Sequence, residues 1–274
     1  MKALKKLSGH AILVLACIAA LFPVYWTVLS SLKTRIDLFA QPPTFWVSQI
    51  TWDNYAQVLA DPEFIRAAIV TIIVTLASTA LATLAGALAA YGLVRRGRFG
   101  GRGTFDGVLI LIRALPGIVI AVPLYKIVVD LGMYDNPGTL IVVYAAINLP
   151  FAVWLMTGFV QGIPYELEEA ARVDGAGQVG VLVRVVLPLI APGLAATTIF
   201  VALMTWNEFL IPLVLADRQA KTLPVYVGGF VTSRVINWGA MAAAASIAIV
   251  PIAILTTLVQ RNLVRGLSSG AIKD

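Results

Sequence analysis

The sequence predicts an all-helical membrane protein with six transmembrane helices. Of its 274 residues, 59% are hydrophobic and only 12% are charged, whereas soluble domains carry about 25% charged residues. The mean hydropathy is correspondingly high, at +0.90. The apolar residues also gather in runs of roughly 20 or more, the length that a helix needs to cross a bilayer. We therefore expect a single membrane domain over residues 1–274, with no large soluble part.

Six apolar stretches follow one another along the chain and are the expected spans. The first follows a basic start and is too long for the apolar region of a signal peptide. The second is rich in small residues, and Gly86 and Gly92 should let a neighbouring helix approach closely. The connection at 33–66 contains proline and aromatic residues, which predicts a loop with short helical turns. The spans are 11–32, 67–93, 105–129, 138–160, 189–215 and 239–258.

The basic residues are distributed unevenly between the connections. An even number of spans puts both termini on one side, together with the connections 95–106 and 161–188. These segments hold twelve Lys and Arg residues, against seven on the other side. The positive-inside rule therefore places both termini in the cytoplasm. This distribution accounts for the net charge of +6 without nucleic acid, and we expect the arginines at 95–102 near anionic headgroups.

A polar segment, Pro164–Pro188, separates the fourth span from the fifth. Pro164 suits the first turn of a helix, where negative side chains are also favourable. Asp174-Gly175 predicts a stop and a tight turn, because glycine adopts positive φ without cost. A second helix is expected from Gln178 to Leu187, ended by Pro188. The residues alone allow a solvated loop or an element that binds a partner. The acidic residues expected in the first turn are Glu166, Glu168 and Glu169.

The order of residues in this segment resembles a known signature. Glu169-Ala170-Ala171 is followed after three residues by Gly175, and after nine more by Val185-x-Leu187-Pro188. This resembles the EAA signature of ABC-importer permeases, with Val185 where isoleucine is usual. In that family the segment is a cytoplasmic coupling helix that docks into a groove on an ATPase. The resemblance implies that the ATPase-coupling residues are Glu169, Ala170, Ala171, Asp174, Gly175, Leu187 and Pro188.

Two ionisable residues, Arg113 and Glu208, fall inside expected spans. Such residues cost roughly 2.5–3.5 kcal/mol at the centre of a span and usually face a bundle interior or a wet cavity. They therefore line a translocation path, or they form a structural pair, or Arg113 snorkels to the nearby membrane surface. Asn148 precedes Leu149-Pro150 and either lines the path or satisfies backbone groups freed by the proline.

A further resemblance concerns the fifth span. Trp206-Asn207-Glu208-Phe209 is similar to the WNEF run of sugar-type permeases. An aromatic ring beside an amide and a carboxylate suits a sugar, although Trp206 could instead pack and Asn207 bond a neighbouring helix. The candidate substrate path thus consists of Arg113, Asn148, Trp206, Asn207 and Glu208.

The resemblance as a whole implies a type I ABC-importer permease of the carbohydrate, maltose-type family in the bacterial inner membrane. Its expected partners are two ATPase subunits, a second permease of different sequence, an external solute-binding protein that delivers a sugar-like solute, and the lipid bilayer. The loop 216–238 either reaches into the binding protein or is an ordinary connector. The C-terminal tail resembles that of maltose-type permeases, which contacts the ATPases, or it is a frayed end.

The sequence contains nothing that predicts catalysis. It has no GxxxxGK[ST] loop, so ATP and Mg²⁺ are expected on the separate ATPase subunits, and no cofactor on this chain. One histidine and one cysteine do not predict a His/Cys metal cluster. The alternative functions are a secondary transporter or channel with Arg113 and Glu208 as ion or proton sites, and a membrane scaffold without transport.

Overall fold

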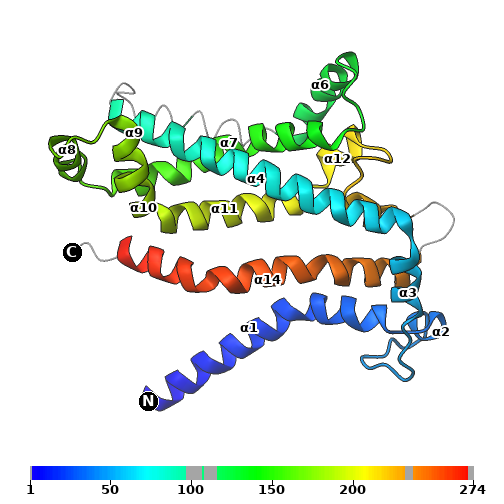
Figure 1. Ribbon diagram of the computed structural model, residues 1–274. Helices are drawn as coiled ribbons and strands as arrows, with labels where there is room; N and C mark the ends of the chain where they lie inside the picture. Colours follow the sequence, from blue (N-terminus) through cyan, green and yellow to red (C-terminus); the bar gives the residue numbers. More distant parts are fainter. Residues whose placement is uncertain (1, 97–106, 108–115, 232–236, 271–274) are drawn as a thin grey trace. The chain divides into compact units, whose positions relative to one another are not determined.

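A computed structural model describes residues 2–96, 107, 116–231 and 237–270, and every regular element among them is a helix (Figure 1). The all-α membrane class is therefore confirmed. Within these residues, four helices are long and apolar enough to cross a membrane, or five if one bent pair counts as a span. Ten of the 25 residues of the predicted third span, 105–129, lie outside the described residues, so the number six stays a prediction. The four helices are His10–Ser31, Pro62–Arg95, Pro137–Gln161 and Trp238–Thr257.

The chain forms two compact units. The first comprises Met1–Ile65 and Val225–Pro251, and the second comprises Arg66–Pro224 and Ile252–Asp274. The prediction of a single membrane domain over residues 1–274, which would include both units, stays a prediction.

The first unit contains the predicted first span and the connection after it. Helix α1 (Lys2–Ser31) is followed by the short helices α2 (Arg35–Leu38) and α3 (Asp53–Ala60), as expected for residues 33–66. Asn54 of α3 holds the end of α1, because its Nδ2 donates to the carbonyls of Ser31 at 3.0 Å and Lys33 at 3.1 Å. Helix α14 (Trp238–Gly270) begins against Asn54, where a Cβ on Gly239 would lie 2.3 Å from the amide oxygen. Glycine is thus needed for this approach.

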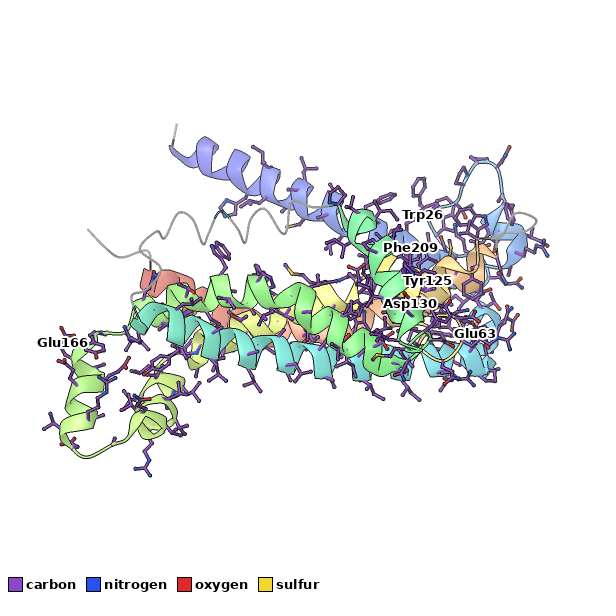
Figure 2. The ribbon with its side chains drawn as sticks, turned by 90° about the horizontal axis from the view of Figure 1, so that it is seen from above. Trp26, Glu63, Tyr125, Asp130, Glu166 and Phe209 are labelled. Carbon is purple, nitrogen blue, oxygen red and sulfur yellow. The ribbon has the colours of Figure 1, made fainter. Side chains whose placement is uncertain are left out.

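Three long helices make up most of the second unit. Helices α4 (Pro62–Arg96), α7 (Pro137–Gln161) and α11 (Ala191–Trp206) run side by side (Figures 1 and 2). Helices α6 (Gly117–Asp130) and α12 (Leu210–Leu215) lie at one end of this bundle. Helix α8 (Glu166–Val173) lies at the other end, and Figure 2 shows Glu166 far from Tyr125 and Asp130. The connections before α7 and after it are therefore at opposite ends, as a membrane-spanning α7 requires.

Small residues bring α4 and α7 together. A Cβ on Gly86 would lie 2.6 Å from the Cβ of Ala152 and 3.0 Å from its carbonyl carbon, so only glycine fits here. Packing of this kind drives helix association in a bilayer, where apolar contact with lipid is equally favourable. The same role was predicted for Gly92, but a Cβ there meets no atom within 4 Å. Among the described residues no helix packs against Gly92, and its predicted role stays a prediction.

Candidate functional site

The first half of the polar segment has the structure that its sequence predicts. Helix α8 carries its acidic residues in the first turn and ends at Val173, with Asp174 as C-cap. Gly175 has φ of +86°, a backbone conformation that other residues adopt only with strain. The helix begins at Glu166, slightly later than expected from Pro164.

The second half differs from the prediction of one helix ended by Pro188. It consists of α9 (Gln178–Val181), a π-helical turn η1 (Leu182–Val186) and α10 (Leu187–Leu189). Pro188 cannot donate to the carbonyl four residues before it, and the chain widens to a π turn at this point. The helical path then bends by 72° before α11. The proline therefore accounts for the wider π turn before it, and the chain bends after this turn, at Ile190.

The seven predicted coupling residues divide between two faces of the segment. Ala171 and Leu187 pack inward, in a cluster with Met156 and Val160 of α7. The other five are exposed, and so are several apolar side chains around them, including Val173 at 87% and Val179 at 74%. The segment therefore presents an outer surface that is both acidic and apolar. Its five predicted members are Glu169, Ala170, Asp174, Gly175 and Pro188.

Glu168 anchors α8 to the end of α4, a contact that sequence reasoning missed. The carboxylate is fully buried, and its Oε1 lies 2.6 Å from Nε of Arg95. Its Oε2 accepts a hydrogen bond from the Tyr91 hydroxyl at 2.9 Å. The side chain of Arg95 is only 15% exposed and pairs with protein, and the position of the arginines at 95–102 near lipid headgroups stays a prediction. The available signal was the spacing of Glu168 and Ala171, which places both on the inner stripe of α8.

The WNEF run interrupts the predicted fifth span. Helix α11 ends at the buried Trp206, and α12 begins only at Leu210. Oε1 of Glu208 accepts hydrogen bonds from the backbone N–H groups of Leu210 at 3.0 Å and Ile211 at 3.2 Å. The carboxylate thus accepts hydrogen bonds from N–H groups at the start of α12 that have no partner within the helix, and negative charge is favourable at this position. Asn207 is exposed, and its Nδ2 donates to a carbonyl of its own helix.

Asn148 links α7 to α11. It is 6% exposed, and its Nδ2 donates to the carbonyl of Tyr144 at 3.0 Å and to Oγ1 of Thr205 at 3.2 Å. The structure therefore brings Asn148 beside the residue that precedes Trp206. Arg113 lies outside the described residues.

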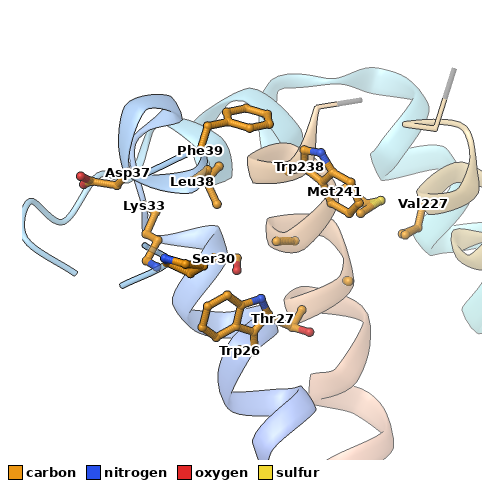
Figure 3. A pocket seen from close by; sticks show the side chains of 13 residues that line it. Trp26, Thr27, Ser30, Lys33, Asp37, Leu38, Phe39, Val227, Trp238 and Met241 are labelled. Carbon is orange, nitrogen blue, oxygen red and sulfur yellow. The ribbon is translucent and has the colours of Figure 1, made fainter. Parts of the chain in front are cut away.

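A pocket of about 510 Å³ lies in the first unit (Figure 3). Trp26 and Ser30 of α1 and Trp238 and Met241 of α14 line it. Lys33, also in its wall, is almost fully buried and lies 5.0 Å from the ring of Trp26. Asn148, Trp206, Asn207 and Glu208 do not line it.

Comparison with known proteins identifies the family. The family model described as "Binding-protein-dependent transport system inner membrane component" matches residues 82–269. The chain belongs to this family. It is thus an importer permease subunit, as predicted, and ATP hydrolysis in such systems is carried by separate subunits. This membership favours the importer over a secondary transporter or channel.

Several known proteins are similar to this permease over nearly their whole length. The diacetylchitobiose uptake permease DasC of Streptomyces coelicolor is 34% identical over 93% of both chains. The trehalose transport permease SugB of Mycobacterium tuberculosis is 35% identical, also over 93% of both chains. The melibiose/raffinose/stachyose import permease MelC of Bacillus subtilis is 34% identical over 100% of both chains.

Solved structures share the fold of the permease. A chain of a bacterial ABC transporter for the acidic polysaccharide alginate superposes with a TM-score of 0.80. It is 24% identical, and the match covers 94% of this chain and 96% of that chain. A chain of the MetNI methionine ABC transporter matches with a TM-score of 0.59 at 18% identity, over 74% of this chain and 94% of that one. The all-helical permease fold is therefore confirmed.

Asp135 lies at the opposite end of the bundle from α8 and binds the backbone of the loop after α12. Both carboxylate oxygens accept backbone N–H groups, from four consecutive residues at 2.9–3.1 Å. Burial acts to raise the pKa of Asp135, but these four donors outweigh it and lower the pKa below the ordinary value. Asp135 itself has φ of +54° and donates its own N–H to the carbonyl of Leu215. The turn before α7 is thus fastened to the loop after α12. The four donors are Asp217, Arg218, Gln219 and Ala220.

Proposed function

We propose that the permease passes a sugar or a related polar solute into the cytoplasm in an ATP-driven importer. A second permease subunit of different sequence completes the path, and two ATPase subunits bind ATP and Mg²⁺ and drive the change of conformation. An external binding protein delivers the solute. Support for a sugar comes from the relatives, three of which are named for oligosaccharide uptake.

The outer surface of the segment 164–188 carries this proposal. Apolar side chains such as Val173 and Val179 are exposed on it beside Glu169 and Asp174. Exposed apolar groups gathered in a polar connection are typical of a protein-binding surface. The inner face is fixed by Ala171 and the buried Glu168, so the outer surface is held by the bundle beneath it. A rigid helix gripped by an ATPase groove moves when the groove moves, and it carries α7 and α11 with it.

The orientation follows from the same assignment. ATPase subunits are cytoplasmic, so the end of the bundle with α8 faces the cytoplasm, together with both termini. The end with Asp135 and the loop 216–238 faces outward, where the binding protein docks. The solute path runs between them and includes Arg113, Asn148, Trp206, Asn207 and Glu208. On this proposal the indole of Trp206 stacks on the sugar, and its neighbours bond the hydroxyls.

Two substitutions on the outer surface test the coupling role. Glu169→Lys reverses a charge on the exposed face, and Gly175→Asp puts a side chain at φ +86°. Each should abolish uptake while the assembled complex still hydrolyses ATP. Asp130→Asn, at the far end of the bundle, is the control and should transport normally (Figure 2).

The measurement is uptake of radiolabelled trehalose, melibiose and diacetylchitobiose in cells that express the whole importer at matched membrane levels. Normal uptake by both coupling variants would contradict the role of the segment. Uptake that survives ATP depletion but collapses with the proton gradient would favour a secondary transporter. Failure of the wild type to take up any of the three sugars would count against oligosaccharides of this type.

A further inference from the structure

The buried ion pair joins α8 to a helix that is not its neighbour in the chain. The backbone connects the coupling segment to α7 before it and to α11 after it. Arg95 and Glu168, however, are 73 residues apart in sequence, and their side chains meet at 2.6 Å. Arg95 also donates from Nη2 to the carbonyl of Ile163 at 3.2 Å, just before α8. The end of α4 therefore contacts the coupling segment at Glu168 and the chain just before the segment at Ile163, and no covalent connection requires either contact.

Three further side chains contact the pair: Tyr91, Tyr165 and Arg172. Tyr165 lies near two guanidinium groups, with its ring centre 5.7 Å from Cζ of Arg95 and 5.3 Å from Cζ of Arg172. Nη1 of Arg172 donates to the Tyr165 hydroxyl at 2.7 Å, and its Nη2 lies 3.5 Å from Oε2 of Glu168. Tyr91 donates to the same oxygen, Oε2, and Arg95 donates to Oε1, so both carboxylate oxygens are used. Each polar group of this cluster is thus held by at least one other member.

The burial of Glu168 makes this contact stiff. A carboxylate without access to water cannot exchange its partner for solvent, and removing one member of a buried pair leaves an uncompensated charge. The pair of Lys126 and Asp130 in α6 is the opposite case. Its side chains are 77% and 61% exposed, and water can replace either partner. Beneath the buried pair, Ala87 and Ala90 of α4 pack in the same apolar cluster as Val181 of α9.

We propose that Glu168 and Arg95 are positioning residues that make α4 move together with the coupling segment. Displacement of α8 by the ATPase is then passed to three helices instead of two: α7 and α11 through the backbone, and α4 through the ion pair. This proposal rests on the proposed function. It assigns Glu168 a different role from Glu169, because the first faces the permease and the second faces the partner.

The direct test is the distance between α8 and α4. In a Cys17→Ser background, spin labels at Glu166→Cys, an exposed position of α8 outside the predicted coupling residues, and at Leu88→Cys, which is 53% exposed, report this distance in the complex in nanodiscs. With Glu168 intact, the distribution should keep its centre and width between the nucleotide-free and the vanadate-trapped state. Glu168→Gln should broaden it and shift it between the two states. Asp130→Asn, which breaks the exposed pair, should behave as the wild type.

The second readout is the number of solute molecules transported per ATP hydrolysed. Loss of the contact should lower this ratio, because movement of α8 would then no longer carry α4 with it. We expect this loss for Glu168→Gln and Arg95→Met, and retention of most of the ratio for Arg95→Lys, which keeps the charge. A merely structural role would lower membrane level and thermal stability and leave the ratio unchanged.

Two outcomes overturn the proposal: a wild-type distance distribution for Glu168→Gln in both states, or an Arg95→Lys ratio as low as that of Arg95→Met. These differ from failure of the proposed function. If the wild-type permease brings down no ATPase, the proposed function fails. The label distance in the permease alone still tests whether Glu168 holds α8 to α4.

Discussion

Replacement of Asp135 by asparagine should loosen the loop after α12 without altering the rest of the fold. Asparagine tolerates the positive φ of +54° at this position, so the substitution removes charge without straining the backbone. The substitution replaces one carboxylate oxygen with an NH₂ group. This group faces backbone N–H donors and cannot accept hydrogen bonds from them. The N–H groups of Arg218 and Gln219 lie 3.1 and 3.0 Å from Oδ2, and those of Asp217 and Ala220 lie 2.9 Å from Oδ1.

The size of the effect follows from these contacts. A hydrogen bond to a charged group contributes about 1.5–3 kcal/mol. Three of the four donor residues are exposed, so water replaces part of what is lost, whereas Ala220 is fully buried. A net loss of about 2 kcal/mol is expected, equal to a factor of about thirty in the opening equilibrium of the loop.

Amide hydrogen exchange measures this opening directly, because the four donors are themselves backbone amides. Exchange over residues 217–220 should be about thirty times faster in Asp135→Asn than in the wild type. Amides in the middle of α7 should be unchanged. Asp130→Asn provides the control, because it breaks an exposed pair with Lys126 and should leave the loop protected. Equal exchange at 217–220 in the wild type and Asp135→Asn would refute the reasoning.

Three further predictions follow from the same structure. Because the pKa of Asp135 is lowered in the native state, its contribution to stability is complete at pH values above the ordinary aspartate pKa of 3.8 and is lost as the pH falls through the native pKa. Thermal denaturation in detergent at decreasing pH should show this loss for the wild type but not for Asp135→Asn. Gly86→Ala should lower stability by about 1–3 kcal/mol, because its Cβ would lie 2.6 Å from that of Ala152, whereas equal melting temperatures for Gly86→Ala and Gly92→Ala would contradict the packing argument. Asn148→Ala should cost about 0.6 kcal/mol through the lost bond to α11, measured as a small fall in melting temperature, and an unchanged value would mean that this bond contributes nothing.

The features predicted correctly from the sequence are those that neighbouring residues determine. Apolar runs of bilayer length predicted the positions of α1, α4, α7 and α14, because length and hydropathy are local properties. The turn at Gly175 was predicted because a single residue type suits positive φ. The exposed position of Glu169 agrees with its expected role, but that role stays a prediction.

The features that were missed depend on residues far apart in the sequence. Glu168 and Arg95 pair across 73 residues, and Asp135 binds amides more than 80 residues away. Adjacent glutamates look alike in sequence, and only the packing of α8 on α4 separates Glu168 from Glu169. Glu208 was assigned to the path, and the structure adds a second role for it as a helix cap. The cap could not be predicted, because the sequence of residues 189–215 reads as one continuous apolar helix.

The central claim is that the segment 164–188 faces the cytoplasm and is covered there by an ATPase. It is tested most directly by labelling a single cysteine at Val173, 87% exposed in the permease, with a membrane-impermeant maleimide after Cys17→Ser. Inside-out vesicles stripped of the ATPase should be labelled, vesicles that retain it should be protected, and right-side-out vesicles should not react. Labelling in right-side-out vesicles, or labelling that is equal with and without the ATPase, would contradict the account.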